Sequence, residues 1–151
     1  MSTVGHFMVD GYELALDRLY DPESNLWVAP VDGAARIGFD PLGAETTGDI
    51  VAISFPEIGT RIVRGQLLAT VEAAKFVGPL LAPISGTLVA VNEALLRRPG
   101  VINAEPLATW VVELNELDPA ELEALLAEEG QITRWFSAAV ARFRRAGAIA
   151  Q

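Results

Sequence analysis

Between Trp27 and Val112 the apolar residues occur in short runs. Brief runs rich in β-branched residues, such as DIVAISF, GTLVAV and TWVVEL, are separated by glycines and prolines that recur every few residues. Many short strands with turn residues between them are typical of an all-β sandwich or barrel. The pattern therefore predicts a mainly β region over this part of the chain.

Two pairs of these segments repeat at nearly the same offset. GDIVAI from Gly48 and GTLVAV from Gly86 begin 38 residues apart, and LLATV from Leu67 and PLATW from Pro106 begin 39 residues apart. The offset indicates two related β units packed about a pseudo-two-fold axis, although chance similarity between short strands remains an alternative. Lys75 would then lie between the units, at the exposed tip of a hairpin.

The chain becomes helical in character after the β region. Residues 117–130, LDPAELEALLAEEG, predict a helix that begins at the N-cap Asp118 and ends at Gly130. A second, amphipathic helix is expected beyond about Ile132, and a shorter one from Asn92. The apolar face of the second helix consists of Trp135, Phe136, Ala139, Val140 and Phe143, and its other face carries Arg134, Arg142, Arg144 and Arg145.

Composition narrows the classes of function. The chain has 151 residues, is 51% hydrophobic and carries a net charge of −9, so it can bury a core. Its negative charge argues against nucleic acid or an anionic membrane as a partner. The absence of cysteine excludes disulfides, thiol catalysis and thiolate zinc sites. We see no signal peptide and no apolar run of transmembrane length, and we expect a cytoplasmic protein.

Conventional catalytic residues are scarce. The single histidine, His6, lies in an N-terminal stretch that we expect to be flexible, where a solvated side chain is the default interpretation. We find no Ser/His/Asp set, no phosphate-binding glycine loop and no metal-ligand cluster. The sequence therefore predicts neither catalytic residues nor a metal site, and a non-enzymatic role is favoured.

Lys75 is the candidate functional residue, because it is the only lysine beside ten arginines. A guanidinium stays protonated, whereas an amine can lose its proton and form an amide. The flanking Glu72, Ala73 and Ala74 and the following Phe76 form the surroundings of this attachment site, and the small side chains leave the amine accessible to a modifying enzyme. An ordinary surface lysine is the competing interpretation.

Residues 48–106 resemble the H protein of the glycine cleavage system and, more generally, lipoyl-carrying domains. The family pattern places a Val-Glu strand end, two small or medium residues and the lipoylated lysine before a Pro-x-Ser-Gly turn and a helix segment. The matching stretches here are VEAAK, APISG and VNEAL, with LYDPESNLWV and DPAELEALLAEE similar to the family's N-terminal and C-terminal regions. The resemblance covers about residues 17–130.

This resemblance implies a fold, a cofactor and partners. It implies a lipoyl-domain-like hammerhead, a flattened β barrel or sandwich, over residues 17–130, preceded by an extension (1–16) and followed by the C-terminal amphipathic helix (131–151). It implies lipoic acid in amide linkage to Lys75, so that the dithiolane supplies the sulfur chemistry that the chain lacks. Implied partners are a lipoate ligase or lipoyl transfer enzymes and dihydrolipoamide dehydrogenase.

The stretch after Lys75 departs from the usual family pattern. EAAKF replaces the common Glu-Ser-Val-Lys-Ala, and KFVGP is similar to H-like lipoate-binding proteins that work with a heterodisulfide-reductase-like complex in sulfur oxidation. We favour that carrier role slightly. The close alternative is glycine cleavage with glycine decarboxylase and aminomethyltransferase. A second alternative is an unmodified binding module that uses the C-terminal helix for docking, although we favour packing of that helix on the barrel through Trp135, Phe136 and Phe143.

Overall fold

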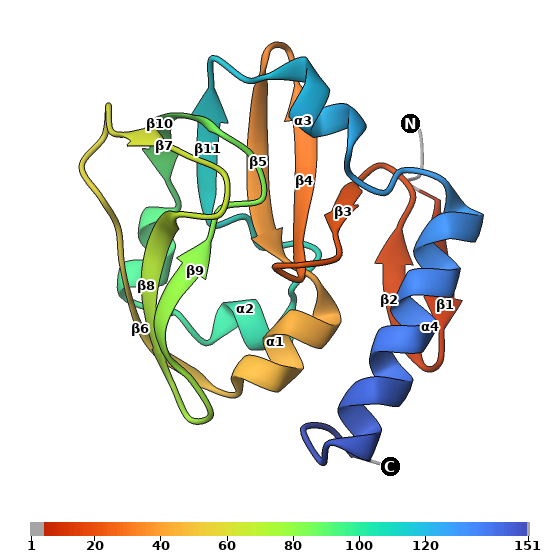
Figure 1. The fold of residues 1–151 in the computed structure, drawn as a ribbon. Helices are drawn as coiled ribbons and strands as arrows, with labels where there is room; N and C mark the ends of the chain where they lie inside the picture. The colour runs from red at the N-terminus through yellow and green to blue at the C-terminus, as the bar shows by residue number, and fades with distance from the viewer. Residues whose placement is uncertain (1–4, 151) are drawn as a thin grey trace.

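Two β-sheets form the body of the protein in the computed structural model, which describes residues 5–150 (Figure 1). The larger sheet consists, in spatial order, of β3 (Leu19–Asp21), β4 (Leu26–Val31), β5 (Ala34–Phe39), β11 (Val112–Asn115), β10 (Gly86–Val91) and β7 (Arg61–Ile62). The smaller sheet consists of β6 (Ile50–Ser54), β8 (Leu67–Ala73) and β9 (Val77–Leu81). Every pairing within both sheets is antiparallel.

A hydrophobic core is shared by the two sheets. Ile37, Val71, Leu88 and Leu114 are fully buried in it, and each such side chain contributes about 1.5–3 kcal/mol through removal of apolar surface from water. The strands of the described residues form open sheets rather than a closed barrel. The predicted mainly β, lipoyl-domain-like architecture is thus confirmed in its sandwich form.

Only one of the two predicted pairs of repeated segments forms strands in both copies. The 38-residue offset relates β6 to β10, and these strands pair with β8 and β11 respectively. The second half of the prediction is wrong, because residues 106–110 lie outside any strand. The N–H of Ala108 donates to the carbonyl of Glu105 in a turn, and Pro106 has no N–H to offer a β ladder.

Three short helical segments lie in the connections of the sandwich. They are α1 (Pro41–Thr47), the 3₁₀ helix η1 (Glu93–Leu96) and α2 (Val101–Ala104). The predicted helix start at Asn92 is confirmed, since its side chain accepts a hydrogen bond from the N–H of Ala94. Helix α1 was not predicted from the sequence.

The predicted helix over residues 117–130 is wrong in length. Helix α3 spans only Pro119–Glu123, and α4 begins at Glu129, so Gly130 lies in the first turn of α4 instead of ending a helix. The N–H and C=O of Leu126 exchange hydrogen bonds with Tyr20 of β3, both at 2.9 Å. This pairing replaces helical hydrogen bonds and separates the two helices.

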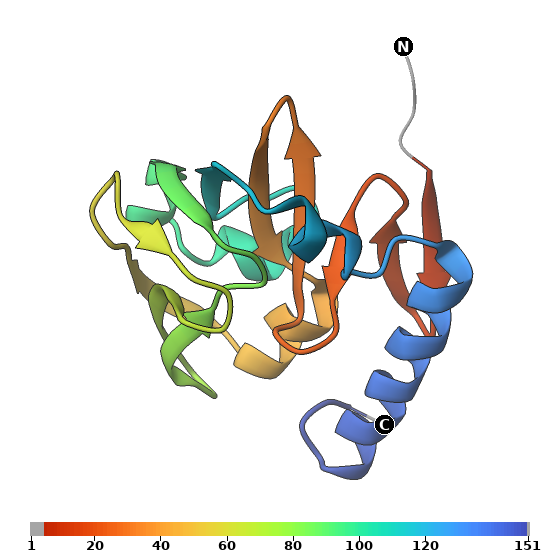
Figure 2. The ribbon, with the colours of Figure 1, turned by 45° about the horizontal axis from the view of Figure 1, so that its top comes forward.

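The N-terminal hairpin and the C-terminal helix lie side by side next to the sandwich (Figures 1 and 2). Helix α4 (Glu129–Arg145) lies along the hairpin formed by β1 (His6–Val9) and β2 (Tyr12–Ala15), and together they enclose a second core. Its buried members are Val9, Leu14, Tyr20, Trp27, Leu42, Ile132, Phe136, Ala139, Val140 and Ile149. The packing role of the C-terminal helix is therefore confirmed, with the N-terminal hairpin as much of its partner surface.

This hairpin corrects the expectation of a flexible N-terminal stretch. The turn residues Asp10 and Gly11 have φ angles of 49° and 90°, which suit a two-residue hairpin turn. Residues 6–15 are thus regular structure, and residues 1–4 of the predicted extension lie outside the described part. Among the described residues, no helix combines the length and the apolar character needed to cross a bilayer.

Candidate functional site

Lys75 lies at the tip of the β8–β9 hairpin, as predicted. Glu72 and Ala73 end β8, Ala74 and Lys75 form the turn, and Phe76 leads into β9. The N–H of Ala73 donates to the carbonyl of Phe76 at 2.9 Å and closes the turn. Lys75 is exposed, so its amine is accessible to another protein.

The segment after α1 holds this tip in place. The N–H of Lys75 donates to the carbonyl of Thr47 at 3.1 Å, and the N–H of Ala74 donates to the carbonyl of Asp49 at 3.0 Å. Gly48 between them has a φ of 83°, and a Cβ there would lie 3.0 Å from Cγ of Lys75. A glycine is required by both the backbone conformation and the closeness of the lysine.

Asn103 of α2 links the elements around the tip. Its Nδ2 donates to the carbonyl of Gly48 at 2.8 Å and to that of Ala44 at 3.3 Å, while its Oδ1 accepts from the N–H of Ile50 at 3.0 Å. One side chain therefore connects α1, the Gly48 turn and β6. The sequence analysis missed Asn103, because its partners are distant along the chain.

A buried carboxyl group begins α1. Asp40 is fully buried; its Oδ1 accepts from the N–H of Gly43 at 2.7 Å, and its Oδ2 accepts from Nδ2 of Asn25 at 3.2 Å. Burial raises the pKa of Asp40 to about 7, and its hydrogen bonds only partly oppose that effect. The N-cap residue of the helix that holds Lys75 is thus near its titration midpoint at neutral pH.

A cleft of about 550 Å³ opens beside Lys75, and we call it the Tyr12 cleft. Its lining residues are Tyr12, Pro41, Ala44, Glu45, Gly48, Asp49, Ala74, Lys75, Asn103 and Pro106. Nζ of Lys75 lies 3.5 Å from the carbonyl oxygen of Glu45, to which it donates. The hydroxyl of Tyr12 donates to the Glu45 carboxylate, and burial, followed by the effects of Glu45, raises the pKa of Tyr12 to about 12.

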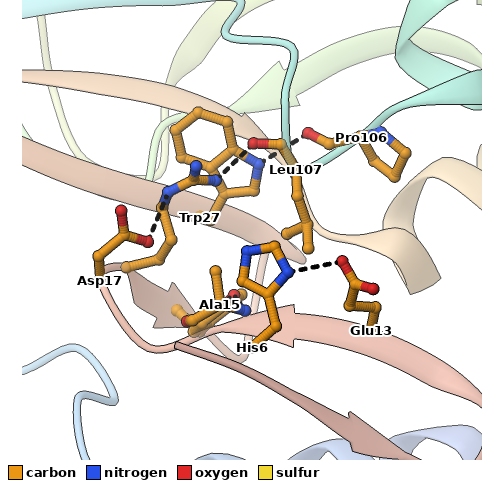
Figure 3. A network of polar contacts seen from close by, with 9 residues as sticks. His6, Glu13, Ala15, Asp17, Trp27, Pro106 and Leu107 are labelled. Atoms are coloured by element: carbon orange, nitrogen blue, oxygen red, sulfur yellow. Dashed lines mark hydrogen bonds and ion pairs between the residues drawn. The ribbon is translucent and has the colours of Figure 1, made fainter. Parts of the chain in front are cut away.

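Polar contacts surround residues 106–107 and the base of the N-terminal hairpin (Figure 3). Nε1 of Trp27 donates to the carbonyl of Pro106 at 3.0 Å, and Nη1 of Arg18 donates to the carbonyl of Leu107 at 2.6 Å. Nδ1 of His6 lies 2.8 Å from the Glu13 carboxylate. The first two contacts hold β4 and the chain after β2 against residues 106–107, and the third lies within the hairpin.

A smaller cleft of about 190 Å³ is lined in part by Phe76, and we call it the Phe76 cleft. Its lining residues are Glu23, Ser24, Asn25, Phe39, Gly43, Thr46, Thr47, Phe76, Pro79, Leu80 and Leu81. Phe76 thus faces a different cleft from the one that Lys75 lines. Lys75 and its four predicted surrounding residues are adjacent in the hairpin but do not line one pocket.

The APISG turn is fixed by a carboxylate from α3. The N–H of Ser85 donates to Oε1 of Glu121 at 2.7 Å, and its hydroxyl donates to Oε2 at 3.0 Å. The same hydroxyl accepts from the N–H of Arg64 at 2.9 Å. Ser85 and Glu121 therefore stabilise the chain between β9 and β10, at a distance from the chemistry of Lys75.

Comparisons with known proteins identify the family. The model of the glycine cleavage H-protein family matches residues 18–138. The chain belongs to the glycine cleavage H-protein family. The match confirms the resemblance found in the sequence and includes the sandwich, α3 and part of α4, whereas the β1–β2 hairpin precedes it.

Individual relatives agree with this assignment. The chain is 38% identical to glycine cleavage system H protein 4 of Aquifex aeolicus, over 82% of this chain and 72% of the relative. It is 37% identical to a glycine cleavage system H protein of Listeria monocytogenes, over 77% and 93%. The crystal structure of the Mycobacterium marinum H protein matches with a TM-score of 0.67 and 29% identity, over 80% of this chain and 98% of that chain.

Family membership establishes the cofactor class. H proteins of glycine cleavage are lipoyl carriers with covalently attached lipoate, and lipoic acid is accordingly the cofactor of this chain. The exposed primary amine of Lys75, at a hairpin tip beside a cleft, fits an amide-linked arm. The relatives named above carry the glycine cleavage name, which agrees with the alternative pathway rather than with sulfur oxidation.

Proposed function

We propose that this chain is the lipoyl carrier of a glycine cleavage system and that Lys75 is its attachment point. The observation that carries the proposal is the exposed amine of Lys75 on a turn held by Thr47 and Asp49, at the edge of the Tyr12 cleft. The chain itself performs no catalysis and presents the arm to partner enzymes. When bound, the lipoyl group supplies the redox-active sulfurs.

The charge of the cleft favours a cationic cargo. Lys75 is the only cationic residue among those that line the Tyr12 cleft, and amide formation would remove its charge. The carboxylates of Glu45 and Asp49 would then remain. A protonated aminomethyl group suits this lining, whereas an anionic sulfur cargo would be repelled.

Glycine cleavage is therefore the favoured pathway, and sulfur oxidation becomes the alternative. Partners of the favoured pathway are a lipoate ligase or lipoyl transfer enzyme, glycine decarboxylase, aminomethyltransferase and dihydrolipoamide dehydrogenase. Sulfur oxidation with a heterodisulfide-reductase-like complex stays a prediction that rests on the KFVGP stretch alone. The unmodified binding module has no specific observation in its favour.

The attachment point can be tested by intact mass after co-expression with a lipoate ligase. We expect one lipoyl addition in the wild type and none in Lys75→Arg, which keeps the positive charge but removes the amine. A matched control is Lys75→Arg with Arg97→Lys, which places an exposed lysine elsewhere. Absence of modification in the folded wild type, or modification of either variant, would contradict the proposal.

The pathway requires a separate measurement on the lipoylated protein. We expect glycine decarboxylase to load it with an aminomethyl group, detected as a mass increase that depends on glycine. The heterodisulfide-reductase-like complex is the competing donor. Loading by that complex, without loading by glycine decarboxylase, would reject the glycine cleavage assignment while leaving the carrier role intact.

A further inference from the structure

The backbone around Gly48 supports the Lys75 tip, and a side chain from a distant helix fixes that backbone. We propose that Asn103 of α2 is a positioning residue for covalent attachment, which holds the Gly48 turn in the conformation that presents the Lys75 amine to the attaching enzyme. This inference rests on the proposed attachment at Lys75. Asn103 would act through the backbone that supports the tip, and not on the amine itself.

The Lys75 tip depends on two carbonyl groups that flank Gly48. The N–H of Lys75 donates to the carbonyl of Thr47 at 3.1 Å, and the N–H of Ala74 donates to that of Asp49 at 3.0 Å. Gly48 itself has a φ of 83°, in the left-handed region. Because glycine has no Cβ, its backbone has more conformational freedom than that of any other residue. The two carbonyls are therefore kept directed at the tip by whatever restrains Gly48.

Asn103 supplies this restraint on both sides of the turn. Its Nδ2 donates to the carbonyl of Gly48 at 2.8 Å and to that of Ala44 at 3.3 Å, and its Oδ1 accepts from the N–H of Ile50 at 3.0 Å. Ala44 lies in α1 and Ile50 begins β6, so the turn is fastened to the elements before and after it. Only a side-chain amide both donates twice from one atom and accepts at the other in this planar geometry.

Replacement by aspartate separates positioning from mere packing. Aspartate has the shape of asparagine, but its ionised form only accepts hydrogen bonds. In Asn103→Asp a carboxylate oxygen would face the carbonyl oxygens of Gly48 and Ala44 with no proton between them, and this repulsion releases the turn. A protonated carboxyl group can again donate to Gly48 while its other oxygen accepts from Ile50. Acid should therefore reverse the effect of this variant.

Other groups near Asn103 also titrate, and the wild type provides their correction. The titratable residues of the elements packed around Asn103 are Tyr12, Asp40, Glu45, Asp49, Lys75 and Glu105. All of them are present in the wild type, so comparison of the two proteins at each pH removes their contribution. Asn103→Ala is a second variant, which removes the three hydrogen bonds without adding a titratable group.

The first measurement is the protection of the Ala74 and Lys75 amides against solvent exchange, determined by NMR on the full chain. At about pH 7.5 we expect Asn103→Asp and Asn103→Ala to lose about tenfold in protection, the factor for one net hydrogen bond. As the pH falls to about 4, protection should recover toward the wild-type value in Asn103→Asp alone. Unchanged protection in Asn103→Ala, or a loss in Asn103→Asp that acid does not reverse, would overturn the proposal.

Asn92→Asp is the matched control for these variants. Asn92 is also half-buried; its Nδ2 donates to the carbonyl of Trp110 at 2.8 Å, and its Oδ1 accepts from the N–H of Ala94 at 3.3 Å. The substitution thus removes a comparable link between distant segments, away from the tip. We expect the exchange of the Ala74 and Lys75 amides to stay as in the wild type. An equal loss of protection in this control would show a general loosening of the fold and would refute positioning by Asn103.

The second measurement is the kinetics of lipoylation by a purified lipoate ligase, followed by intact mass. A released turn presents the amine correctly in only a fraction of the molecules, which raises the KM by the inverse of that fraction and leaves kcat unchanged. We expect the KM of Asn103→Ala and Asn103→Asp to rise about tenfold at about pH 7.5, and that of Asn92→Asp to stay constant. Wild-type KM in both Asn103 variants would reject the positioning role alone. Failure of the wild type to accept a lipoyl group would instead contradict the proposed function.

Discussion

Titration of Asp40 should make the stability of the protein fall between acidic and neutral pH. Its folded pKa of about 7 lies about 3 units above the ordinary value of 3.8, because the carboxyl group is fully buried. A raised folded pKa means that the folded state holds the proton more tightly than the unfolded state. The stabilisation is present in full below about pH 4 and is lost as the pH rises to about 7, and its upper limit is about 4 kcal/mol.

Urea unfolding between pH 4 and pH 8.5 measures this effect, with Asp40→Asn as the matched control. Asparagine is also a good N-cap residue and can accept from the N–H of Gly43, but it does not titrate. We expect the free energy of unfolding of the wild type to decrease relative to the variant by up to about 4 kcal/mol across this range. A constant difference between the two proteins would show that Asp40 does not titrate as the structure indicates.

Two further predictions concern the second core and its edge. The chain has two tyrosines, and burial raises the pKa of both Tyr12 and Tyr20 to about 12, so an absorbance titration of phenolate should show no tyrosine ionising near pH 10; one group that titrates near 10 would contradict the packing. Phe136→Ala removes a fully buried ring and should lower the free energy of unfolding by about 3–5 kcal/mol, measured by urea denaturation. A loss below about 1 kcal/mol would indicate that α4 does not pack as described.

The features of the site that could be predicted are those set by residues close together in the sequence. Strand β8 and the lysine at the turn follow from a β-branched run that ends in small residues. The N-terminal hairpin could also have been predicted, because Asp10-Gly11 between two apolar segments is a strong hairpin signal. Similarly, Asp40 before Pro41 is a helix start signal for α1. Both signals are local and do not depend on contacts between distant residues.

The remaining features depended on contacts between distant residues. The sequence from Asp118 to Gly130 is helical in propensity, but the pairing of Leu126 with Tyr20 interrupts it, which local propensity cannot show. The three hydrogen bonds of Asn103 join segments more than 50 residues away. The pathway hypothesis changed for the same reason, since the carboxylates beside Lys75 are brought there by the fold.

The packing of the N-terminal hairpin on the C-terminal helix has a consequence for biosynthesis. Asp10 and Ser137, which join the hairpin to α4, are 127 residues apart, so β1 and β2 leave the ribosome long before their supporting helix exists. Most buried strand residues of the sandwich, including those of the Lys75 hairpin, belong to the other hydrophobic core, which contains no residue of α4. We therefore expect a nascent chain to display a finished lysine tip while the wall of the Tyr12 cleft is still incomplete. An attaching enzyme that acted at that stage would meet Lys75 before Tyr12 takes its place in the cleft that both residues line.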